Sequence, residues 1–429
     1  MKAYKDYTKD ELLTLKAALE EEYKEMESKG LNLNMARGKP GISQLELCMP
    51  MLDVVNSTSD MHTLLGNDTR NYGDLDGIGE MRRLMAYMLE VEKDNVLVGG
   101  NSSLNLMFDT VSRSMTHGVN GSTPWCKLDK VKFLCPVPGY DRHFKITEEF
   151  GIEMINIPLH EDGPDMDLVE KYVNSDPAVK GIWCVPKYSN PTGISYSDEV
   201  VRRFANLKPA AEDFRIYWDN AYGIHHLYDD KQDQILNILE ECKKAGNPNM
   251  VYIFCSTSKI SFPGSGVSAV ASSIENINFI LSHMTVQTIG HDKINQLRHA
   301  RFFKDINGLN EHMKKHAEVL RPKFAAVTET LEAELTGLEI GTWVNPRGGY
   351  FVSFNSMPGC AKEIVKMCKD LGVIMTGAGA TFPYGKDPED SNIRIAPTFP
   401  SIEEMQVASK VFVLCVKLAS VNKLLSNMN

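Results

Sequence analysis

Five short apolar runs between residues 95 and 270 constrain the fold of this chain more than any other feature. They read NVLVGG, VKFLCP, KGIWCVP, FRIYWD and VYIFCS, and segments with helical periodicity separate them. Uninterrupted apolar runs of this length are typical of strands that a parallel sheet buries on both faces. The pattern therefore predicts an α/β domain built on a mostly parallel, doubly wound sheet.

The segments outside this region predict a second, smaller α+β domain. After residue 300 a long charged helical segment, LNEHMKKHAEVLRPKFAAVTETLEAEL, precedes the short runs GGYFVSFN and NIRIAP. Residues 9–29 combine leucines at helical spacing with a dense glutamate face, which predicts an amphipathic helix that is exposed or faces a partner. We expect residues 1–50 to form an N-terminal arm and part of the small domain, 51–300 the large domain, and 301–429 the rest of the small domain.

Composition and charge exclude several classes of function. Hydrophobic residues make up 43% and charged residues 24% of the 429 positions, as in soluble globular proteins. The net charge of −10 offers no basic field to nucleic acid or to an anionic membrane, so we expect neither as a partner. The chain shows no secretory signal and no run of the ~20 apolar residues that a membrane span needs. Nine cysteines without a C-x-x-C pair argue against a disulfide framework or a metal site, and predict a reducing cytoplasm.

Polar residues follow each of the five apolar runs. In open α/β sheets, ligands bind beyond the carboxyl ends of the strands, so we expect these residues to meet at one site. In chain order they are Gly100, Asn101 and Ser102; Tyr140 and His143; Asn190; Asp219 and Tyr222; and Ser256, Ser258 and Lys259. The glycine-rich turn at residues 99–103 offers free backbone amides at the start of a helix, which is a common way to bind phosphate.

The set of groups at these strand ends matches the needs of one cofactor, pyridoxal 5′-phosphate. Asp219 ends a very apolar strand, and a buried ionised carboxylate requires a cation or strong donors. The cofactor needs a lysine for its imine link, an acid that keeps its ring nitrogen protonated, donors to its phenolate oxygen and a phosphate clamp. Lys259, Asp219, Asn190 and the glycine-rich turn supply these groups.

The motifs also carry a family resemblance. Tyr72 in NYGDLDGIGEMR, the GGNSSL turn, PVPGY, NPTG, DNAY, STSK and NIRIAP occur in the order found in fold type I aminotransferases of the aspartate aminotransferase superfamily, which this chain resembles from about residue 36 to 400. The segments ARGKP, GGNSSL and STSKISFPGSG look closest to a divergent branch of aspartate aminotransferases. The resemblance implies a homodimeric enzyme that moves an amino group between an L-amino acid and a 2-oxo acid.

The resemblance implies specific roles around the cofactor ring. Lys259 would form the covalent link and, once released, move a proton between substrate and cofactor. Asp219 would pair with the ring nitrogen, Asn190 and Tyr222 would donate to the phenolate oxygen, and Tyr140 would stack on the ring. From the residues alone, Tyr140 also fits ordinary core.

The resemblance also implies a phosphate site and a carboxylate site. Gly100, Asn101, Ser102, Ser256 and Ser258 would hold the phosphate, and Tyr72 would reach it from a second subunit. Arg394 would bind the substrate α-carboxylate with its planar fork, and Gly38 would leave room for that carboxylate. Arg394 alternates with two isoleucines and therefore also fits the solvated face of an edge strand. The family usually has an arginine about eight residues after the lysine, and this chain has none there.

The amino donor is the least constrained prediction. A dicarboxylic substrate needs a second cation, for which Arg37, Arg142, His143 and Arg347 are candidates. We favour Arg37, because an arginine in the apolar segment NMARGKP needs an anion nearby. His143 fits a structural histidine better than a base. L-Aspartate with 2-oxoglutarate is the predicted pair; aromatic or 2-aminoadipate-type donors, a pyridoxal-phosphate lyase and a pyridoxal-phosphate-binding transcriptional regulator are the alternatives.

Overall fold

An eight-stranded sheet forms the centre of the large domain in the computed structural model, which describes residues 2–428. The strand order is β2-β9-β8-β7-β6-β3-β4-β5, and the neighbours from β8 to β4 pair in parallel. The strands are β2 (Val96–Val98), β3 (Lys132–Val137), β4 (Glu153–His160), β5 (Gly163–Pro164), β6 (Val179–Cys184), β7 (Arg215–Asp219), β8 (Val251–Ser256) and β9 (Ser268–Ala271). The five predicted runs are β2, β3, β6, β7 and β8, so the predicted fold class is confirmed.

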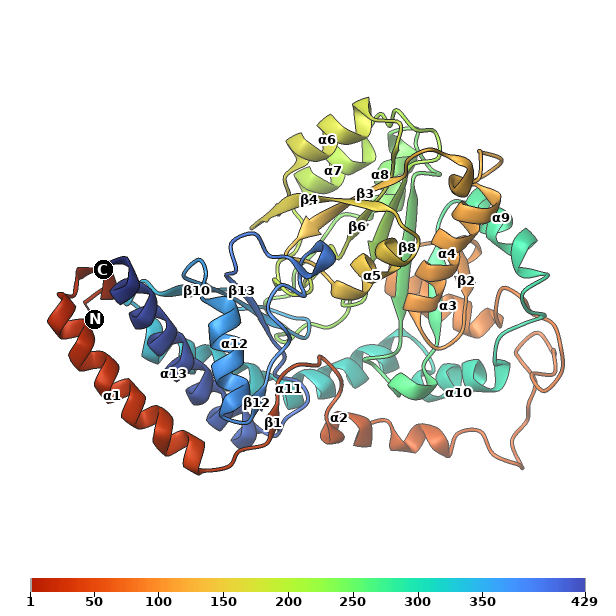
Figure 1. Cartoon of the computed structure of the whole chain (residues 1–429). Coiled ribbons are helices and arrows are strands. Elements are labelled where there is room, and N and C mark those ends of the chain that lie inside the picture. Colours follow the sequence, from red (N-terminus) through yellow and green to blue (C-terminus); the bar gives the residue numbers. More distant parts are fainter. Residues whose placement is uncertain (1, 429) are drawn as a thin grey trace.

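Both faces of this sheet are buried, which explains why its strands are continuous apolar runs. Ile216 and Trp218 of β7 lie in one hydrophobic cluster, whereas Tyr217 between them lies in another. Helices cover the two faces (Figure 1). They are α3 (Gly79–Leu89), α4 (Ser103–His117), α5 (Asp141–Glu149), α6 (Met166–Ser175), α7 (Asp198–Ala205), α8 (Ile238–Lys244) and α9 (Ile274–Met284). Helix α10 (Lys293–Phe303) packs against α3 and α11.

The smaller layer combines the two ends of the chain. Its helices are α1 (Lys9–Ser28), α2 (Ile42–Glu46), α11 (Ile306–Leu335), α12 (Ala361–Asp370) and α13 (Ile402–Asn427). A three-stranded antiparallel sheet contains β10 (Gly341–Trp343), β11 (Val352–Ser356) and β13 (Asn392–Ile395), and β1 (Leu33–Asn34) pairs with β12 (Val373–Ile374). Short 3-10 helices occupy Tyr4–Asp6, Met49–Leu52, Lys93–Asn95, Trp125–Lys127, Pro263–Ser265 and Pro383–Gly385.

Helix α1 packs along α13 of the same chain (Figure 1). Its leucines Leu12 and Leu19 are buried in one cluster with Phe412 and Cys415 of α13. The prediction of an exposed or partner-facing helix is therefore wrong for the apolar face, although the glutamate face is exposed. These contacts support the division at about residues 50 and 300, which we retain as our proposal for the domain limits.

Helix α13 accounts for the apolar segment near the C-terminus. Most of its residues between Met405 and Leu425 are buried against α1, α11 and α12. Within residues 2–428, no helix has the length and apolarity that crossing a membrane requires.

Candidate active site

Lys259 lies in a turn that follows β8. Its Nζ atom is 4.9 Å from the ring centre of Tyr222 and 5.8 Å from that of Tyr350. Burial lowers the pKa of the Lys259 ammonium group, and the Asp219 carboxylate acts in the opposite direction. A lysine that is removed from water by burial loses its proton more readily than a solvated one, as a nucleophilic amine requires.

Asp219 and His143 form a buried pair at the end of β7. The His143 imidazole is 1% exposed, stacks on Trp183 with ring centres 4.6 Å apart, and places Nε2 2.9 Å from Asp219 Oδ2. The other carboxylate oxygen, Asp219 Oδ1, is buried and has no hydrogen-bond partner among residues 2–428. A buried charge with one satisfied and one free oxygen is suited to a cationic ligand atom, so the site fits a protonated ring nitrogen.

Tyr140 and Tyr222 provide aromatic surfaces beside this carboxylate. Tyr140 caps the start of α5, and its ring lies edge-on to His143 with centres 4.9 Å apart. Burial raises the pKa of Tyr140 to about 12 and raises the pKa of Tyr222 well above its usual range. Both phenols therefore keep their protons at neutral pH, and Tyr222 can donate a hydrogen bond.

Arg394 of β13 lies across the domain boundary from α5. Its Nη1 donates to Asp141 Oδ1 at 2.9 Å and to Asn190 Oδ1 at 3.2 Å, and it is 8% exposed. Its Nε is buried without a partner, and its guanidinium lies 4.9 Å from the ring centre of Phe351. Arg394 is thus not a solvated edge residue, and it keeps a free donor for an anionic ligand.

The absence of a side chain at Gly38 makes room for a neighbouring aromatic ring. A Cβ built on Gly38 would lie 2.3 Å from the Phe351 ring. The missing side chain therefore makes room for Phe351, which in turn packs under Arg394. A contribution of Gly38 to carboxylate binding, acting through Phe351, stays a prediction.

The predicted phosphate residues lie together. Ser102 is the N-cap of α4 and its side chain accepts from Leu104 N, so the glycine-rich turn leads directly into a helix N-terminus. Ser258 Oγ donates to Asn101 O at 3.3 Å, and Ser256 Oγ donates to Ser258 Oγ at 3.1 Å. Gly100 is in the same turn, where Ser268 N donates to its carbonyl at 2.7 Å. We refer to Gly100, Asn101, Ser102, Ser256 and Ser258 as the hydroxyl–amide cradle; it contains no cation.

Comparison with known proteins decides the family. The family model described as Aspartate amino-transferase matches residues 7–428. An aspartate aminotransferase of Corynebacterium glutamicum is 45% identical over 403 residues, which cover 94% of this chain and 93% of that protein. The chain belongs to the aspartate aminotransferase family.

Solved structures agree with this assignment. The crystal structure of an aspartate transaminase from Corynebacterium glutamicum matches with a TM-score of 0.95 and 43% identity, over 98% of this chain and 99% of that chain. LysN, an α-aminoadipate aminotransferase from Thermus thermophilus solved with N-(5′-phosphopyridoxyl)-L-leucine, matches with a TM-score of 0.72 and 19% identity, over 92% and 94% of the two chains. The second likeness shows the fold alone. The predicted membership of the superfamily is confirmed.

In this aspartate aminotransferase family member, a buried network supports the backbone of Lys259. Tyr350 OH donates to the Lys259 carbonyl at 3.2 Å, and Gln44 Nε2 donates to Tyr350 OH at 2.9 Å. Gln44 Nε2 also lies 3.1 Å from His316 Nδ1. The turn that contains Lys259 is thereby tied to α2 and α11.

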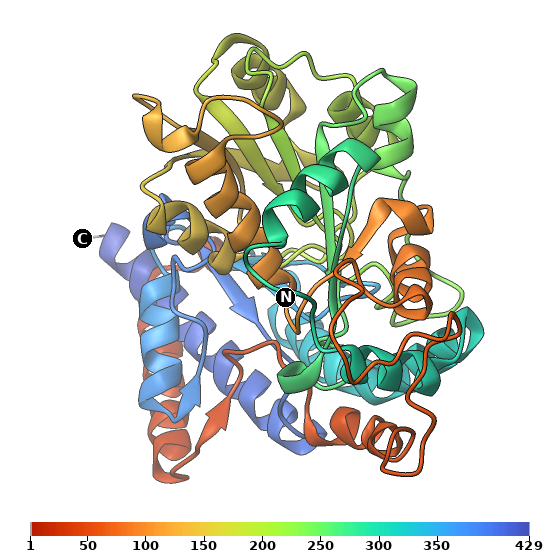
Figure 2. The same cartoon turned by 90° about the vertical axis from the view of Figure 1, so that its right-hand side faces the viewer.

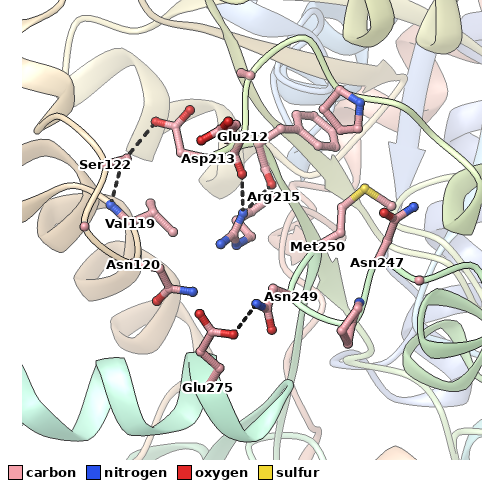
Figure 3. A pocket seen from close by; sticks show the side chains of 16 residues that line it. Val119, Asn120, Ser122, Glu212, Asp213, Arg215, Asn247, Asn249, Met250 and Glu275 are labelled. Atoms are coloured by element: carbon pink, nitrogen blue, oxygen red, sulfur yellow. Dashed lines mark hydrogen bonds between the residues drawn. The ribbon is translucent and has the colours of Figure 1, made fainter.

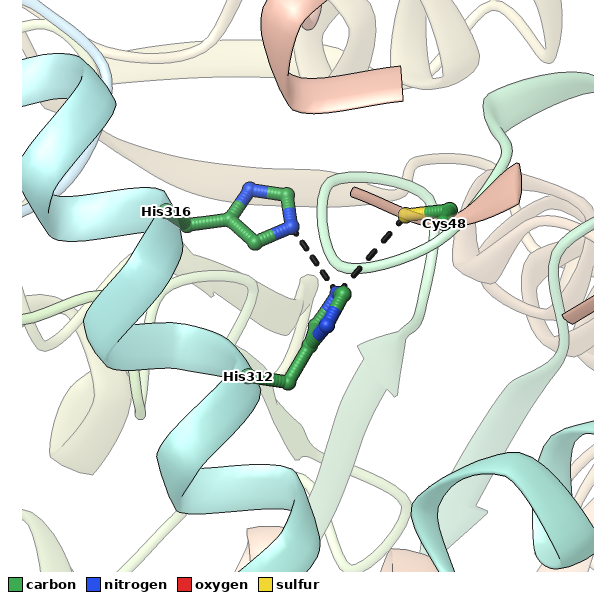
Figure 4. A group of neighbouring side chains, drawn as sticks. All are labelled: Cys48, His312 and His316. Atoms are coloured by element: carbon green, nitrogen blue, oxygen red, sulfur yellow. Dashed lines mark hydrogen bonds between the residues drawn. The ribbon is translucent and has the colours of Figure 1, made fainter. Parts of the chain in front are cut away.

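The same network continues through His316, His312 and Cys48, which Figure 4 shows, to the carbonyl of Ile260, the residue after Lys259. His316 Nε2 lies 3.0 Å from His312 Nε2, which is 2.8 Å from the Ile260 carbonyl. Cys48 Sγ lies 3.6 Å from His312 Nε2 and donates to the same carbonyl at 3.4 Å. Burial lowers the pKa of His316 to about 3 and raises the pKa of Cys48 to about 12, so both groups are neutral hydrogen-bonding partners.

Tyr72 lies outside this cluster in the single chain. Its side chain is 81% exposed, on a segment that runs beside the entry to α10 (Figure 2). The buried Lys293 fixes this segment, because its Nζ donates to the carbonyls of Asn71 at 2.5 Å and Gly73 at 2.9 Å. Tyr72 is therefore held in an exposed position by its own backbone.

The candidates for a second substrate cation are not assembled at the site. Arg37 is exposed and, within residues 2–428, forms no ion pair, so the premise that its segment needs a nearby anion is wrong. Arg142 is also exposed. Arg347 lies 3.5 Å from Asp233, and His143 is committed to Asp219. Arg37 retains only its proximity in sequence to Gly38 as support.

Sequence reasoning missed three contacts that shape the site. Asp141 binds Arg394, Trp183 stacks on His143, and Phe351 fills the space at Gly38. Asp141 directly follows Tyr140, and Trp183 lies one residue before the end of β6, so the strand-end rule brings both into the right region. Their partners are far away in the sequence, and no local pattern identifies them.

A separate cavity of about 510 Å³ lies at the N-terminal ends of β7 and β8, opposite to the ends that carry Asp219 and Lys259 (Figure 3). It is lined by Arg215, the first residue of β7, and by Asn249 and Met250 just before β8. Asp213 at its wall binds Lys180 at 2.5 Å and Trp125 at 2.7 Å. None of the predicted site residues lines this cavity, so it is independent of the candidate active site.

Proposed function

We propose that this chain is a pyridoxal 5′-phosphate-dependent aminotransferase that transfers the amino group of L-aspartate to 2-oxoglutarate. The observation that carries the proposal is the unpartnered Asp219 Oδ1, buried beside Tyr140 and near Lys259. The cofactor, when bound, supplies an electron-withdrawing protonated ring that stabilises negative charge at the substrate Cα.

The chain's own residues would perform the remaining tasks. The amine of Lys259, with its lowered pKa, would take the proton from the substrate Cα and deliver it to the C4′ carbon of the cofactor. The Asp219 carboxylate, oriented by His143, holds a proton on the ring nitrogen. Tyr222 and the amide of Asn190 donate to the phenolate oxygen, and Arg394 uses its free Nε and fork to orient the substrate carboxylate.

The choice of L-aspartate rests on the relatives named aspartate aminotransferase. A second cation for the side-chain carboxylate is required, and we propose Arg37. Because Arg37 is exposed and unpaired in the free chain, it is available to a ligand. Arg142 is the matched alternative, since it is equally exposed and follows Asp141, a partner of Arg394.

Replacing Arg37 with leucine should lower kcat/KM for L-aspartate roughly 10- to 100-fold, because one charge-assisted pair is lost. The value for L-alanine should stay nearly unchanged. Stability to urea should also be unchanged, because the Arg37 side chain is exposed and forms no ion pair within residues 2–428. Initial rates with a panel of L-amino acids and 2-oxoglutarate measure this, with Arg142→Leu as control. Equal losses for alanine and aspartate would make Arg37 structural, and a wild type that prefers phenylalanine would overturn the aspartate assignment.

We also propose a homodimer in which Tyr72 completes the partner's phosphate site. The single chain exposes apolar side chains on two neighbouring segments, Leu64 and Leu65 on one and Val286 and Ile289 on the other. Leu64 and Leu65 precede Tyr72 in the chain, and Val286 and Ile289 precede α10. The two segments meet where a Cβ built on Gly290 would lie 2.6 Å from the carbonyl oxygen of Gly73. Exposed apolar residues on adjacent loops are typical of a surface that a second subunit covers.

Mixing two inactive variants tests this arrangement. Lys259→Ala and Tyr72→Ala homodimers should each be strongly impaired. Unfolding and refolding them together should restore up to about a quarter of wild-type activity, because half of the dimers are mixed and each of these holds one intact site. Sedimentation of the wild type should show a dimer. An active monomer, or no recovery in the mixture, would remove Tyr72 from the site.

We further propose a cytoplasmic location, which the nine free cysteines support.

A further inference from the structure

The hydroxyl–amide cradle lacks a cation, although it faces a doubly charged phosphate in the proposed function. The turn after Lys259 contains Pro263, Gly264, Ser265 and Gly266, with no arginine. A Cβ built on Gly266 would lie 3.1 Å from the carbonyl oxygen of Asn101 and 3.2 Å from Thr257 Oγ1. Gly266 therefore lies directly against the cradle. Because it has no side chain, this position brings no charge to the cradle.

Helix α10 holds this turn from the other side. Asn295 Nδ2 donates to the carbonyls of Gly266 at 2.9 Å and Ser265 at 3.1 Å. Arg298 lies one helical turn further along, and its Nη2 donates to Ser265 Oγ at 2.6 Å and to Asn295 Oδ1 at 2.5 Å. The guanidinium is thus placed beside the residues that border the cradle.

Arg298 has unused binding capacity at this position. Its Nε atom is buried and has no hydrogen-bond partner in the described part of the chain. In the part of the chain from 2 to 428, its known acceptors are neutral oxygens and no carboxylate forms an ion pair with it. A partly buried arginine without an anion keeps a full charge that a phosphate can neutralise.

We propose that Arg298 of α10 supplies the positive charge for the cofactor phosphate, in place of the arginine that the turn after Lys259 lacks. This inference rests on the proposed cofactor site. The hydroxyls and amides of the cradle define the position of the phosphate, and Arg298 balances its charge from the next element. The same helix fixes the Tyr72 segment through Lys293, so α10 connects both parts of the phosphate site.

Binding of two cofactor forms to the apoprotein tests the proposal. Arg298→Met should raise the Kd of pyridoxal 5′-phosphate roughly 10- to 100-fold, as expected for the loss of a charge-assisted contact. The Kd of pyridoxal, which has no phosphate, should change less than about twofold. Inorganic phosphate should compete with the cofactor in the wild type and much more weakly in the variant. Absorbance titrations measure all three quantities without turnover.

Two matched variants separate charge from structure. Ser265→Ala removes the contact of Arg298 with the turn but keeps the charge, and should bind pyridoxal 5′-phosphate nearly as the wild type does. Arg301 lies one turn further along α10, and its guanidinium donates to the backbone carbonyls of Asp60 and His62. Arg301→Met should leave the Kd of pyridoxal 5′-phosphate unchanged. Arg298→Lys should retain most of the affinity, because it keeps the charge. Arg298→Gln, which is polar but uncharged, should show the same loss as Arg298→Met and replaces it if the methionine variant does not fold.

The outcomes distinguish this inference from the proposed function. Equal weakening of both cofactor forms, unchanged binding of pyridoxal 5′-phosphate, or an effect of Ser265→Ala as large as that of Arg298→Met would overturn the role of Arg298. A wild type that binds neither cofactor form would overturn the proposed function itself.

Discussion

Replacing Lys259 with alanine is expected to abolish turnover while the protein stays folded. The side chain is the only amine within the cluster formed by Asp219, Tyr222 and Tyr350, in the part of the chain that the structure describes. Its loss removes both the covalent link and the proton carrier, so kcat should fall roughly 10⁴-fold or more. The fold should not suffer, because burial lowers the pKa of Lys259 and the charged amine is a cost to the apoprotein.

Measurements on the Lys259→Ala protein should include kcat, thermal unfolding and the absorbance of bound cofactor. Lys259→Arg is the matched control, since it keeps the charge and the length but cannot form the link. Both variants should be inactive and folded. Near-normal transamination by either would refute the assignment of the site.

Replacing Asp219 with alanine should cost about 3 to 4 kcal/mol in transition-state stabilisation, as the loss of an electrostatic partner in a buried site commonly does. The effect should appear mainly in kcat, because Asp219 acts on the ring nitrogen and not on the substrate carboxylate. Asp219→Asn should be only slightly better. It can keep the contact with His143 but brings no negative charge to the free Oδ1 position.

Asp213 is a matched control for this experiment. It is also a buried carboxylate next to β7, but it lies at the opposite end of the strand and binds Lys180 and Trp125. Asp213→Asn should lower stability, because it leaves Lys180 without its ion pair, and kcat should be nearly unchanged. If Asp219→Ala kept the wild-type kcat, or if both variants lost kcat equally, the position of the cofactor ring would be wrong.

The features predicted from sequence are those that depend on local patterns and on one topological rule. Apolar runs identified β3, β6, β7 and β8, since both faces of each are buried. Strand β4 lies next to the two-residue edge strand β5, and only its residues Met154 and Ile157 are buried, so it gives no continuous apolar run. The rule that ligands bind beyond the carboxyl ends of parallel strands then selected Asp219 and Lys259.

The features that sequence reasoning could not provide depend on contacts between distant residues. His143 is 76 residues from Asp219, and Asp141 is 253 residues from Arg394. Neither distance leaves a local signal. The exposure of Arg37 could not be predicted for a related reason: an apolar segment does not determine whether its arginine faces the core or the solvent.

The first half of the reaction is the decisive test of the proposed aminotransferase activity. Purified holoprotein should be mixed with L-aspartate in the absence of any 2-oxo acid, and absorbance and products should be followed. An aminotransferase should release one equivalent of oxaloacetate per site and convert its bound cofactor to the pyridoxamine form. Addition of 2-oxoglutarate should reverse this conversion fully. Continuous release of ammonia or carbon dioxide without a 2-oxo acid would identify a lyase instead, and no spectral change with any L-amino acid would contradict the aminotransferase account.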